Sequence, residues 1–259
     1  MASTLYLIPT PLGDFTQPAD SHSALLSTLP QETLHIAAGL KTFIVEQAKT
    51  ARAFLKQLPT VTPLQQLTLL ELNEHTPAAT LELLLAPLLA GEDVGLLSEA
   101  GCPAIADPGA NLVRLAHQRG LRVRPLTGPS SILLALMGSG LIGQRFAFHG
   151  YLPAKAEERA TALLNLESRA QQDDAAQVFI ETPYRNQAML ASILSCCQPD
   201  TLLTLACDLT LASEFLATRT VADWRSALLP DLQKRPTVFL IYNALKPKPP
   251  HQKASRTRK

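Results

Sequence analysis

The segment VGLLSEAGCPAIADPGANLV, residues 94 to 113, changes character twice along its length. It opens as a small apolar strand, passes into a loop of Glu, Gly, Cys and Pro, and restarts as a helical pattern after Asp107-Pro108-Gly109. We expect Asp107 to cap that helix, with Pro108 at its first position. A core strand does not need such a loop, whereas a ligand bound at the end of a strand does. The segment therefore predicts an α/β fold with a binding site at the carboxyl end of this strand.

The alternation of strand and helix continues on both sides of this segment. Short apolar strands are expected at residues 4–9, 42–46, 67–72, 93–98 and 121–126. Helical spacing of apolar residues separates them, at residues 23–30, 47–58, 77–90 and 109–120. Apolar strands that alternate with helices predict a parallel sheet covered on both faces.

The pattern changes after Gly143. Strands are expected at residues 145–153, 176–182, 201–209, 214–221 and 236–242, and helices at 155–170, 183–197 and 222–229. The third and fourth of these strands follow each other closely, which favours an antiparallel pair and a mixed sheet. We therefore predict an α/β fold of two domains, residues 1–126 with a mostly parallel sheet and residues 127–245 with a mixed sheet. Residues 246–259, rich in Pro, Lys and Ser, are expected to form a basic disordered tail.

Composition excludes several classes of protein. The 259 residues are 46% hydrophobic, and the uncharged run at residues 125–144 is interrupted by Gly and Pro, so no membrane span is expected. Four cysteines show no C-x-x-C spacing, and no signal peptide is recognisable, so we expect a reduced, cytoplasmic protein. Of the 23 basic side chains, six lie in residues 246–259 without any of the 22 acidic ones, which leaves the rest of the chain with a net charge of −5.

Three turn-rich segments follow strands of the first domain, at residues 9–14, 98–109 and 127–131. Loops at the carboxyl ends of parallel strands converge on one edge of the sheet, so together these segments predict a ligand-binding crevice. None of them has the glycine spacing of a dinucleotide site or a P-loop, and no His or Cys cluster has metal-ligand spacing. We therefore expect no metal and no pyrophosphate cradle.

Five motifs, taken in order, resemble a known superfamily. They are LYLIPTPLGD, LLSEAGCPAIADPGANLV, PLTGPSSILLAL, FHGYLP and ETPYRN. The set is similar to the tetrapyrrole methylase superfamily of S-adenosylmethionine-dependent methyltransferases. Within it, the chain most resembles the bacterial small-subunit ribosomal RNA ribose 2′-O methyltransferase family. The resemblance implies two α/β domains, S-adenosylmethionine in the cleft between them, no metal, and commonly a homodimer.

The resemblance also indicates which residues hold the methyl donor. A Gly-Cys-Pro loop lets backbone approach the donor closely, and carboxylate and hydroxyl groups can hydrogen-bond it. The expected cofactor-binding residues are Pro11, Leu12, Glu99, Gly101, Cys102, Pro103, Ser130, Ser131, Thr182 and Pro236. The last two would close the cleft from the second domain.

The groups that act on the methyl acceptor are less narrowly defined. A ribose hydroxyl is a poor nucleophile, so a base is expected, and the candidates are Glu46, His75 and Glu181. Asn73, Tyr184 and Arg185 are candidate substrate-binding residues, since tyrosine can stack on a base and arginine can pair with phosphate. Asn73 and His75 can equally cap the helix expected near Pro77, and Tyr184 can equally serve in packing.

Three functions are compatible with these features. The first is methyl transfer to RNA, ribosomal RNA in particular, and the second is methyl transfer to a tetrapyrrole or another small molecule. The third is a donor-binding regulatory protein without catalysis. It is suggested by Gln47-Ala48-Lys49, where the ribosomal RNA family tends to have Asp-Thr-Arg.

Overall fold

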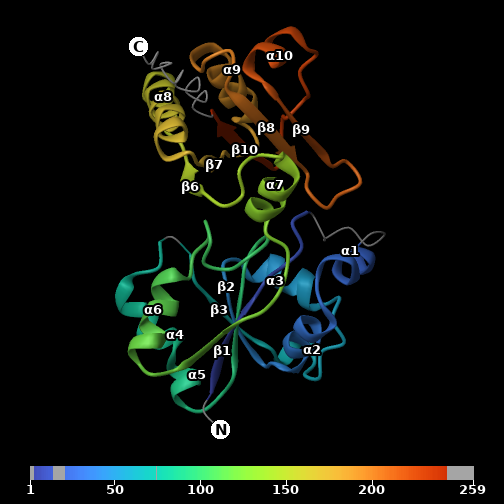
Figure 1. Cartoon of the computed structure of the whole chain (residues 1–259). Helices are drawn as coiled ribbons and strands as arrows, with labels where there is room; N and C mark the ends of the chain where they lie inside the picture. Colours follow the sequence, from blue (N-terminus) through green and yellow to red (C-terminus); the bar gives the residue numbers. More distant parts are fainter. Residues whose placement is uncertain (1–2, 14–20, 74, 244–259) are drawn as a thin grey trace, which may run out of the picture. The chain divides into compact units, whose positions relative to one another are not determined.

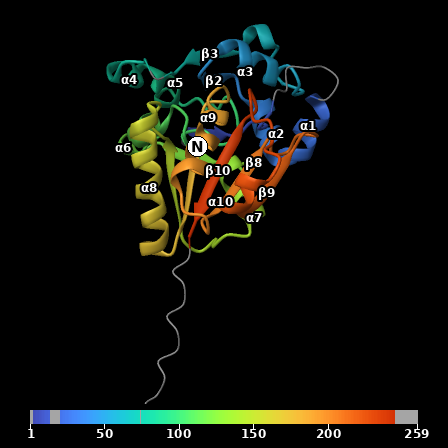
Figure 2. The ribbon, with the colours of Figure 1, turned by 90° about the horizontal axis from the view of Figure 1, so that it is seen from above.

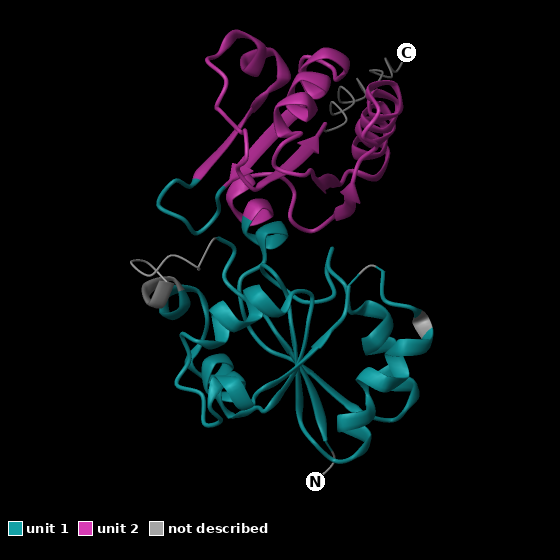
Figure 3. Cartoon of the chain, turned by 180° about the vertical axis from the view of Figure 1, so that it is seen from behind, with its two compact units in different colours: residues 1–134, 208–214 teal, residues 135–207, 215–259 magenta. Residues whose placement is uncertain are grey.

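The computed structural model describes residues 3–13, 21–73 and 75–243, and the predicted tail at 246–259 lies outside this part. The chain forms two compact units (Figure 3): Met1–Leu134 with Asp208–Glu214, and Ala135–Cys207 with Phe215–Lys259. The division thus falls after Leu134 rather than after Leu126. The segment Asp208–Glu214 belongs to the first unit because the Leu211 side chain fills the space beside Gly13, which has no Cβ.

The first unit contains a five-stranded parallel sheet, as the alternating pattern predicts (Figure 1). The strand order is β3-β2-β4-β1-β5. The strands are β1 (Thr4–Ile8), β2 (Thr42–Val45), β3 (Thr68–Glu71), β4 (Val94–Leu97) and β5 (Arg122–Pro125). All four residues of β2 and of β4 are buried, which explains why these strands read as continuous apolar runs.

Helices cover both faces of this sheet (Figure 1). One face packs on α1 (Ser21–Thr28), α2 (Gln31–Gly39) and α3 (Ala48–Leu55) around Phe43 and Phe54. The opposite face packs on α4 (Leu81–Leu84), α5 (Ala86–Leu89) and α6 (Ala110–Gln118) around Ile44 and Leu112. Two short 3-10 helices, η1 (Leu64–Gln66) and η2 (Ala78–Thr80), complete the unit.

Two helices of this unit differ from the sequence-based expectation. The single helix expected at residues 77–90 is divided into η2, α4 and α5. Pro87 has no N–H to donate and its ring clashes with the carbonyl four residues earlier, so a continuous helix cannot pass it. Helix α2 was not predicted; it begins directly after Pro30, at which the sequence analysis ended the preceding helix.

The second unit contains a mixed sheet of order β6-β7-β10-β8-β9, which confirms the prediction. β6 and β7 are parallel, and the other neighbours are antiparallel; β10, β8 and β9 run side by side in Figure 2. The strands are β6 (Phe146–Tyr151), β7 (Ala176–Ile180), β8 (Leu202–Cys207), β9 (Phe215–Thr220) and β10 (Thr237–Tyr242). The helices are α8 (Ala156–Asp173), α9 (Asn186–Cys196) and α10 (Val221–Ser226), whereas α7 (Ser131–Ser139) contains the point of division between the units.

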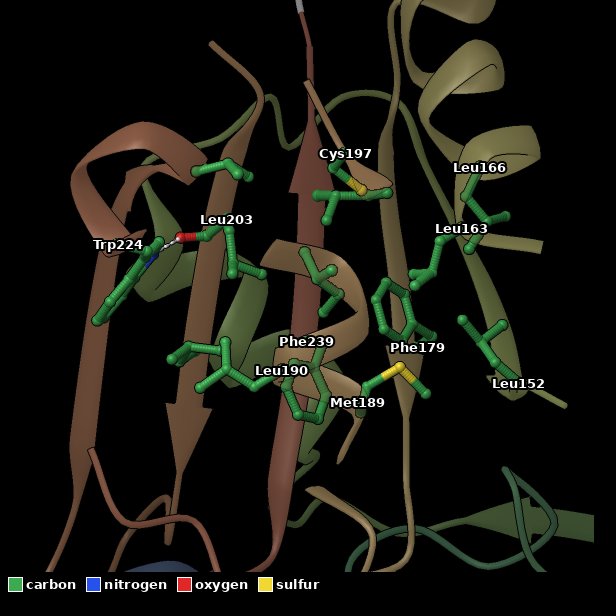
Figure 4. Packing of buried hydrophobic residues seen from close by; sticks show 14 of the residues in the cluster. Leu152, Leu163, Leu166, Phe179, Met189, Leu190, Cys197, Leu203, Trp224 and Phe239 are labelled. Atoms are coloured by element: carbon green, nitrogen blue, oxygen red, sulfur yellow. Dashed lines mark hydrogen bonds between the residues drawn. The ribbon is translucent and has the colours of Figure 1, made fainter. Parts of the chain in front are cut away.

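One core holds this sheet to α8, α9 and α10 (Figure 4). The rings of Phe179 and Phe239 stack at 5.6 Å between centroids, and the Trp224 indole donates a 2.9 Å hydrogen bond to the Leu203 carbonyl. Helix α9 begins at Asn186 rather than at Pro183 as expected, because residues 182–185 form a turn closed by the Arg185 N–H and the Thr182 carbonyl. No helix in the described part of the chain is long and apolar enough to cross a membrane.

Candidate functional site

The loop after β1 is fastened to the loop after β4 by backbone hydrogen bonds. The Thr10 N–H donates to the Gly101 carbonyl, and the Gly101 N–H donates to the Thr10 carbonyl, both at 3.0 Å. The Thr10 and Ser98 hydroxyls lie 3.2 Å apart, and the Ser98 hydroxyl donates to the Gly101 carbonyl. These contacts are buried, so the loop that carries Gly101 is held in a defined conformation.

Gly101 is the residue around which these loops are arranged. Its φ of +73° lies in the left-handed region, which residues with a Cβ seldom adopt. A Cβ at this position would lie 3.0 Å from Leu12 Cδ2 and 3.5 Å from the Pro129 carbonyl oxygen. Three predicted loops, after β1, β4 and β5, therefore do meet at one place, and glycine is required there by both backbone angle and space.

The strand order explains why a site forms at this edge. The connection from β1 to β2 runs through α1 and α2 on one face of the sheet, whereas the connection from β4 to β5 runs through α6 on the opposite face, and β1 and β4 are neighbours. Connections that diverge in this way leave a crevice at the carboxyl ends of the two strands, the usual ligand site of open α/β sheets. The loops that carry Thr10 and Gly101 begin at these two strand ends.

A carboxylate cluster of Glu46, Glu99 and Asp107 lies at the ends of β2 and β4, the edge of the sheet from which the Gly101 loop also begins. The Glu99 carboxylate accepts hydrogen bonds from the Thr50 hydroxyl and the Gln47 N–H at the start of α3. Burial and the Glu46 charge raise the pKa of Glu99. Glu99 thus belongs to the carboxylate cluster and also holds the segment that follows β2 through its hydrogen bonds to Gln47 and Thr50.

Asp107 does not cap α6 as the sequence suggests. The helix begins at Ala110, preceded by Gly109 at a φ of +129°, and Asp107 lies in the loop before them. Its side chain is hydrogen-bonded to Glu46 instead, and burial together with the Glu46 and Glu99 charges raises the pKa of Asp107 to about 7. Because a carboxylate can only accept, a hydrogen bond between two carboxyl groups requires a proton on one of them.

The other cofactor-binding candidates of the first unit lie on the same loops. Pro11 and Pro103 are buried, and Leu12 is half-buried beside Gly101. The Cys102 thiol donates to the Pro129 carbonyl at 3.4 Å, and burial raises its pKa. Ser130 precedes α7 and Ser131 is its first residue. The candidates of the first unit thus lie on the three loops that meet at Gly101, and their role in holding a cofactor stays a prediction.

Glu181, at the end of β7, is a fully buried carboxylate of the second unit. Its Oε1 atom accepts from the Thr182 N–H at 2.6 Å and the Thr182 hydroxyl at 3.1 Å. The same oxygen accepts from Arg185 Nε at 2.9 Å and Nη2 at 2.7 Å. Oε2 has no partner among the described residues. Glu181 therefore fixes the Arg185 guanidinium, and this hydrogen-bonded ion pair raises the pKa of Arg185.

Thr182 and Pro236 lie at the same edge of the second sheet, because Ile180 of β7 pairs with Val238 of β10. The loop before β10 is tied to the start of α9 by Asn186, whose Nδ2 donates to the Arg235 carbonyl at 2.6 Å and to the Thr237 hydroxyl at 3.2 Å. Pro236 itself is exposed. Sequence reasoning selected Pro236 and overlooked Asn186, which is fully buried.

Asn73 and His75 form a local turn after β3. Asn73 Oδ1 accepts from the His75 N–H at 3.0 Å, and the Asn73 N–H donates to the Thr76 hydroxyl at 2.9 Å. The residues thus stabilise the turn before η2, and the His75 side chain is exposed. This arrangement resembles the capping alternative more than a site that encloses a substrate.

Two participants in the first unit's site were missed as functional candidates, Thr10 and Thr50. Thr10 lies within a recognised motif, but its pairing with Gly101 joins segments 91 residues apart in sequence and leaves no local pattern. Among the described residues, no group of three or more His, Cys, Asp or Glu side chains is arranged to hold a metal ion.

Solved structures of other proteins share the fold of this chain. The chain superposes on the methyltransferase CobJ with a TM-score of 0.58 and 18% identity, covering 93% of each chain. It superposes on diphthine synthase with a TM-score of 0.60 and 14% identity, covering 93% of this chain and 90% of the other. At such identities the similarity establishes the fold, which is the predicted one.

Curated sequences are more closely related, although no family model matches the chain. It is 30% identical over 238 residues to ribosomal RNA small subunit methyltransferase I of Xylella fastidiosa, covering 92% of this chain and 80% of that protein. It is 31% identical over 206 residues to the protein of the same name from Escherichia coli O157:H7, covering 80% of this chain and 65% of the other. The chain therefore belongs to the ribosomal RNA small subunit methyltransferase I family of methyltransferases.

Proposed function

We propose that this chain is an S-adenosylmethionine-dependent methyltransferase that modifies ribosomal RNA at a ribose 2′-hydroxyl. The observation that supports it most strongly is the meeting of three loops around Gly101 at the edge where β1 and β4 end. Membership of the family supports the reaction and the RNA substrate. The small-molecule alternative is supported by proteins that share the fold alone, such as cobalt precorrin-4 methyltransferase at 14% identity.

The residues around Gly101 suit S-adenosylmethionine. This donor supplies an electrophilic methyl group on a positively charged sulfonium. The Gly101 loop presents backbone without a Cβ, the carboxylates of Glu46, Glu99 and Asp107 offer negative charge and acceptors, and Ser130 lies at the start of α7. Together these groups can bind a cationic ligand rich in hydroxyl and amino groups without a metal.

Deprotonation of the acceptor hydroxyl is assigned to a carboxylate rather than to His75. Glu46 lies beside Asp107, whose raised pKa of about 7 allows Asp107 to take up or release a proton near neutral pH. The charge of Glu181 is committed to Arg185 and its side chain is buried, which favours a positioning role for Glu181. We therefore propose Glu46, with Asp107, as the first pair to test.

The direct test is transfer of labelled methyl from S-adenosylmethionine. RNA and small-molecule fractions from cells that lack the protein are the acceptors, and Glu46→Gln is the matched variant. We expect label in ribosomal RNA at a 2′-O-methyl nucleotide, and a loss of about 100-fold or more in rate for the variant. Label in the small-molecule fraction alone would contradict the proposal.

Donor binding is tested separately by calorimetry. We expect about one S-adenosylmethionine per chain, with the same affinity in the presence of a chelator. The proposal further includes a cytoplasmic homodimer, which analytical ultracentrifugation and cell fractionation would test. A metal-dependent affinity would contradict the site as described.

A further inference from the structure

Two tyrosines of the second unit are exposed at the edge that carries Glu181. Tyr151, the last residue of β6, is 56% exposed, and Tyr184, in the turn after β7, is 70% exposed. Large aromatic side chains stabilise a protein when they are buried, and these two exposed rings gain little of that stabilisation. Neither belongs to the core cluster of the second unit.

A β-bulge sets the position of Tyr151. Phe148 pairs with Val178 and Tyr151 pairs with Ile180, so β6 has one more residue than β7 over this interval. Gly150, at a φ of +64° with open space where a Cβ would lie, accommodates the extra residue. Because side chains alternate between faces, one inserted residue moves Tyr151 to the face opposite the one that unbroken register would give.

Arg185 joins the two tyrosines into one surface. Its guanidinium carbon lies 5.5 Å from the centroid of the Tyr184 ring, and it is close enough to Tyr151 for the two side chains to interact electrostatically. Glu181 holds Nε and Nη2, while Nη1 has no hydrogen-bond partner among the described residues. The guanidinium is thus fixed by a buried carboxylate, yet its side chain remains 30% exposed with donor capacity to spare.

Exposed aromatic rings beside a fixed arginine are the groups that bind unpaired nucleotides, since rings stack on bases and the guanidinium pairs with a phosphate or a base edge. A purely structural role would not require rings that face solvent. Resting on the proposed function, we propose that Tyr151, Tyr184 and Arg185 form a surface on which the RNA substrate stacks unpaired bases.

The experiment measures binding and turnover of RNA by the full chain. Fluorescence anisotropy with a labelled single-stranded oligonucleotide compares wild type with Tyr151→Ala and Tyr184→Ala, each matched by the phenylalanine variant, which keeps the ring. Leu228→Ala, at a 98% exposed apolar residue of the same unit, is the surface control. Each alanine variant is expected to weaken binding about tenfold, while phenylalanine and the control remain within about twofold of wild type.

Turnover separates this surface from the donor site. The alanine variants should raise KM for RNA with kcat and the affinity for S-adenosylmethionine unchanged, because the rings belong to the second unit, whereas the hydrogen bonds that hold the Gly101 loop are made within the first unit. Unchanged RNA affinity and KM in both alanine variants would overturn the inference while leaving the methyltransferase intact. Absence of RNA methylation by wild-type protein would instead contradict the proposed function.

Discussion

At the scale of the residue, the backbone of Gly101 is as informative as any side chain. The nearby Leu12 side chain and the bonds to Thr10 leave no room for adjustment there. Gly120, in the turn between α6 and β5, has nearly the same φ, +69°, but open space around it. A comparison of the two glycines therefore separates the cost of a positive φ, which both share, from the effect of close neighbours, which only Gly101 has.

Gly101→Ala is expected to abolish donor binding, whereas Gly120→Ala is expected to preserve it. Both variants should lose about 1 kcal/mol of unfolding free energy, because alanine is strained at a positive φ. Only the first brings a Cβ into contact with Leu12 and into the loop that would face the donor. Calorimetry with S-adenosylmethionine and thermal unfolding provide the measurements. Equal losses of affinity in the two variants would assign Gly101 to stability alone.

Asp107 predicts a pH dependence of stability. Its pKa is raised from an ordinary value of 3.8 to about 7 in the folded state, mainly by burial. Between these two values the folded protein binds more protons than the unfolded protein, so this group lowers stability as pH rises from about 4 to about 7. Replacing Asp107 by Asn removes the penalty, because the amide is uncharged and still donates toward Glu46.

We therefore expect Asp107→Asn to be more stable than wild type at pH 8, by about 1 kcal/mol after allowance for partial solvent screening. Near pH 4 the difference should vanish. Asp173→Asn, at an exposed residue at the end of α8, is the control and should show no such dependence on pH. Urea unfolding at a series of pH values measures all three proteins, and a pH-independent difference for Asp107→Asn would contradict the assignment.

At the scale of the element, Asn186 determines how α9 meets the loop before β10. Its amide nitrogen has acceptors on Arg235 and Thr237, which are about fifty positions away in sequence, and the Lys234 N–H donates to the Pro183 carbonyl at 3.1 Å. The sequence predicted the helix and the strand, but each boundary there depends on these contacts. The start of α9 was accordingly misplaced by three residues, at Pro183 instead of Asn186.

Asn186→Ala is expected to cost about 2 kcal/mol of unfolding free energy, since it leaves buried carbonyl and hydroxyl groups without their donor. Ser195→Ala, at an exposed residue of the same helix, should stay within about 0.5 kcal/mol of wild type. Urea denaturation measures both. Similar small losses in the two variants would show that the Asn186 contacts do not hold the loop.

At the scale of the whole molecule, charge is divided unequally along the sequence. The six basic side chains of residues 246–259 lie beyond the described residues, and the chain without them has a net charge of −5. An acidic protein that binds RNA needs a local source of positive charge, and each phosphate contact releases condensed counterions.

Removal of residues 246–259 is expected to weaken RNA binding and to flatten its dependence on salt, while donor affinity stays unchanged. If the tail neutralises three or four phosphates of single-stranded RNA, the slope of log affinity against log salt should fall by about 2 to 3. Filter binding at several salt concentrations measures this slope. Identical slopes for the full and shortened chains would exclude the tail from RNA binding.

The sequence by itself determined the two α/β units, the parallel and mixed sheets, and the three loops that carry the site, because strand and loop identity follow from local apolar patterns and from Gly and Pro. The local sequence pattern does not reveal which residue, distant in sequence, will form a hydrogen bond with a given polar atom. Asp107 was therefore read as a helix cap, although the fold pairs it with Glu46, 61 residues earlier in the chain. Likewise the Thr10–Gly101 bridge and the bulge that turns Tyr151 were decided only by tertiary structure, since strand order and register bring their atoms together.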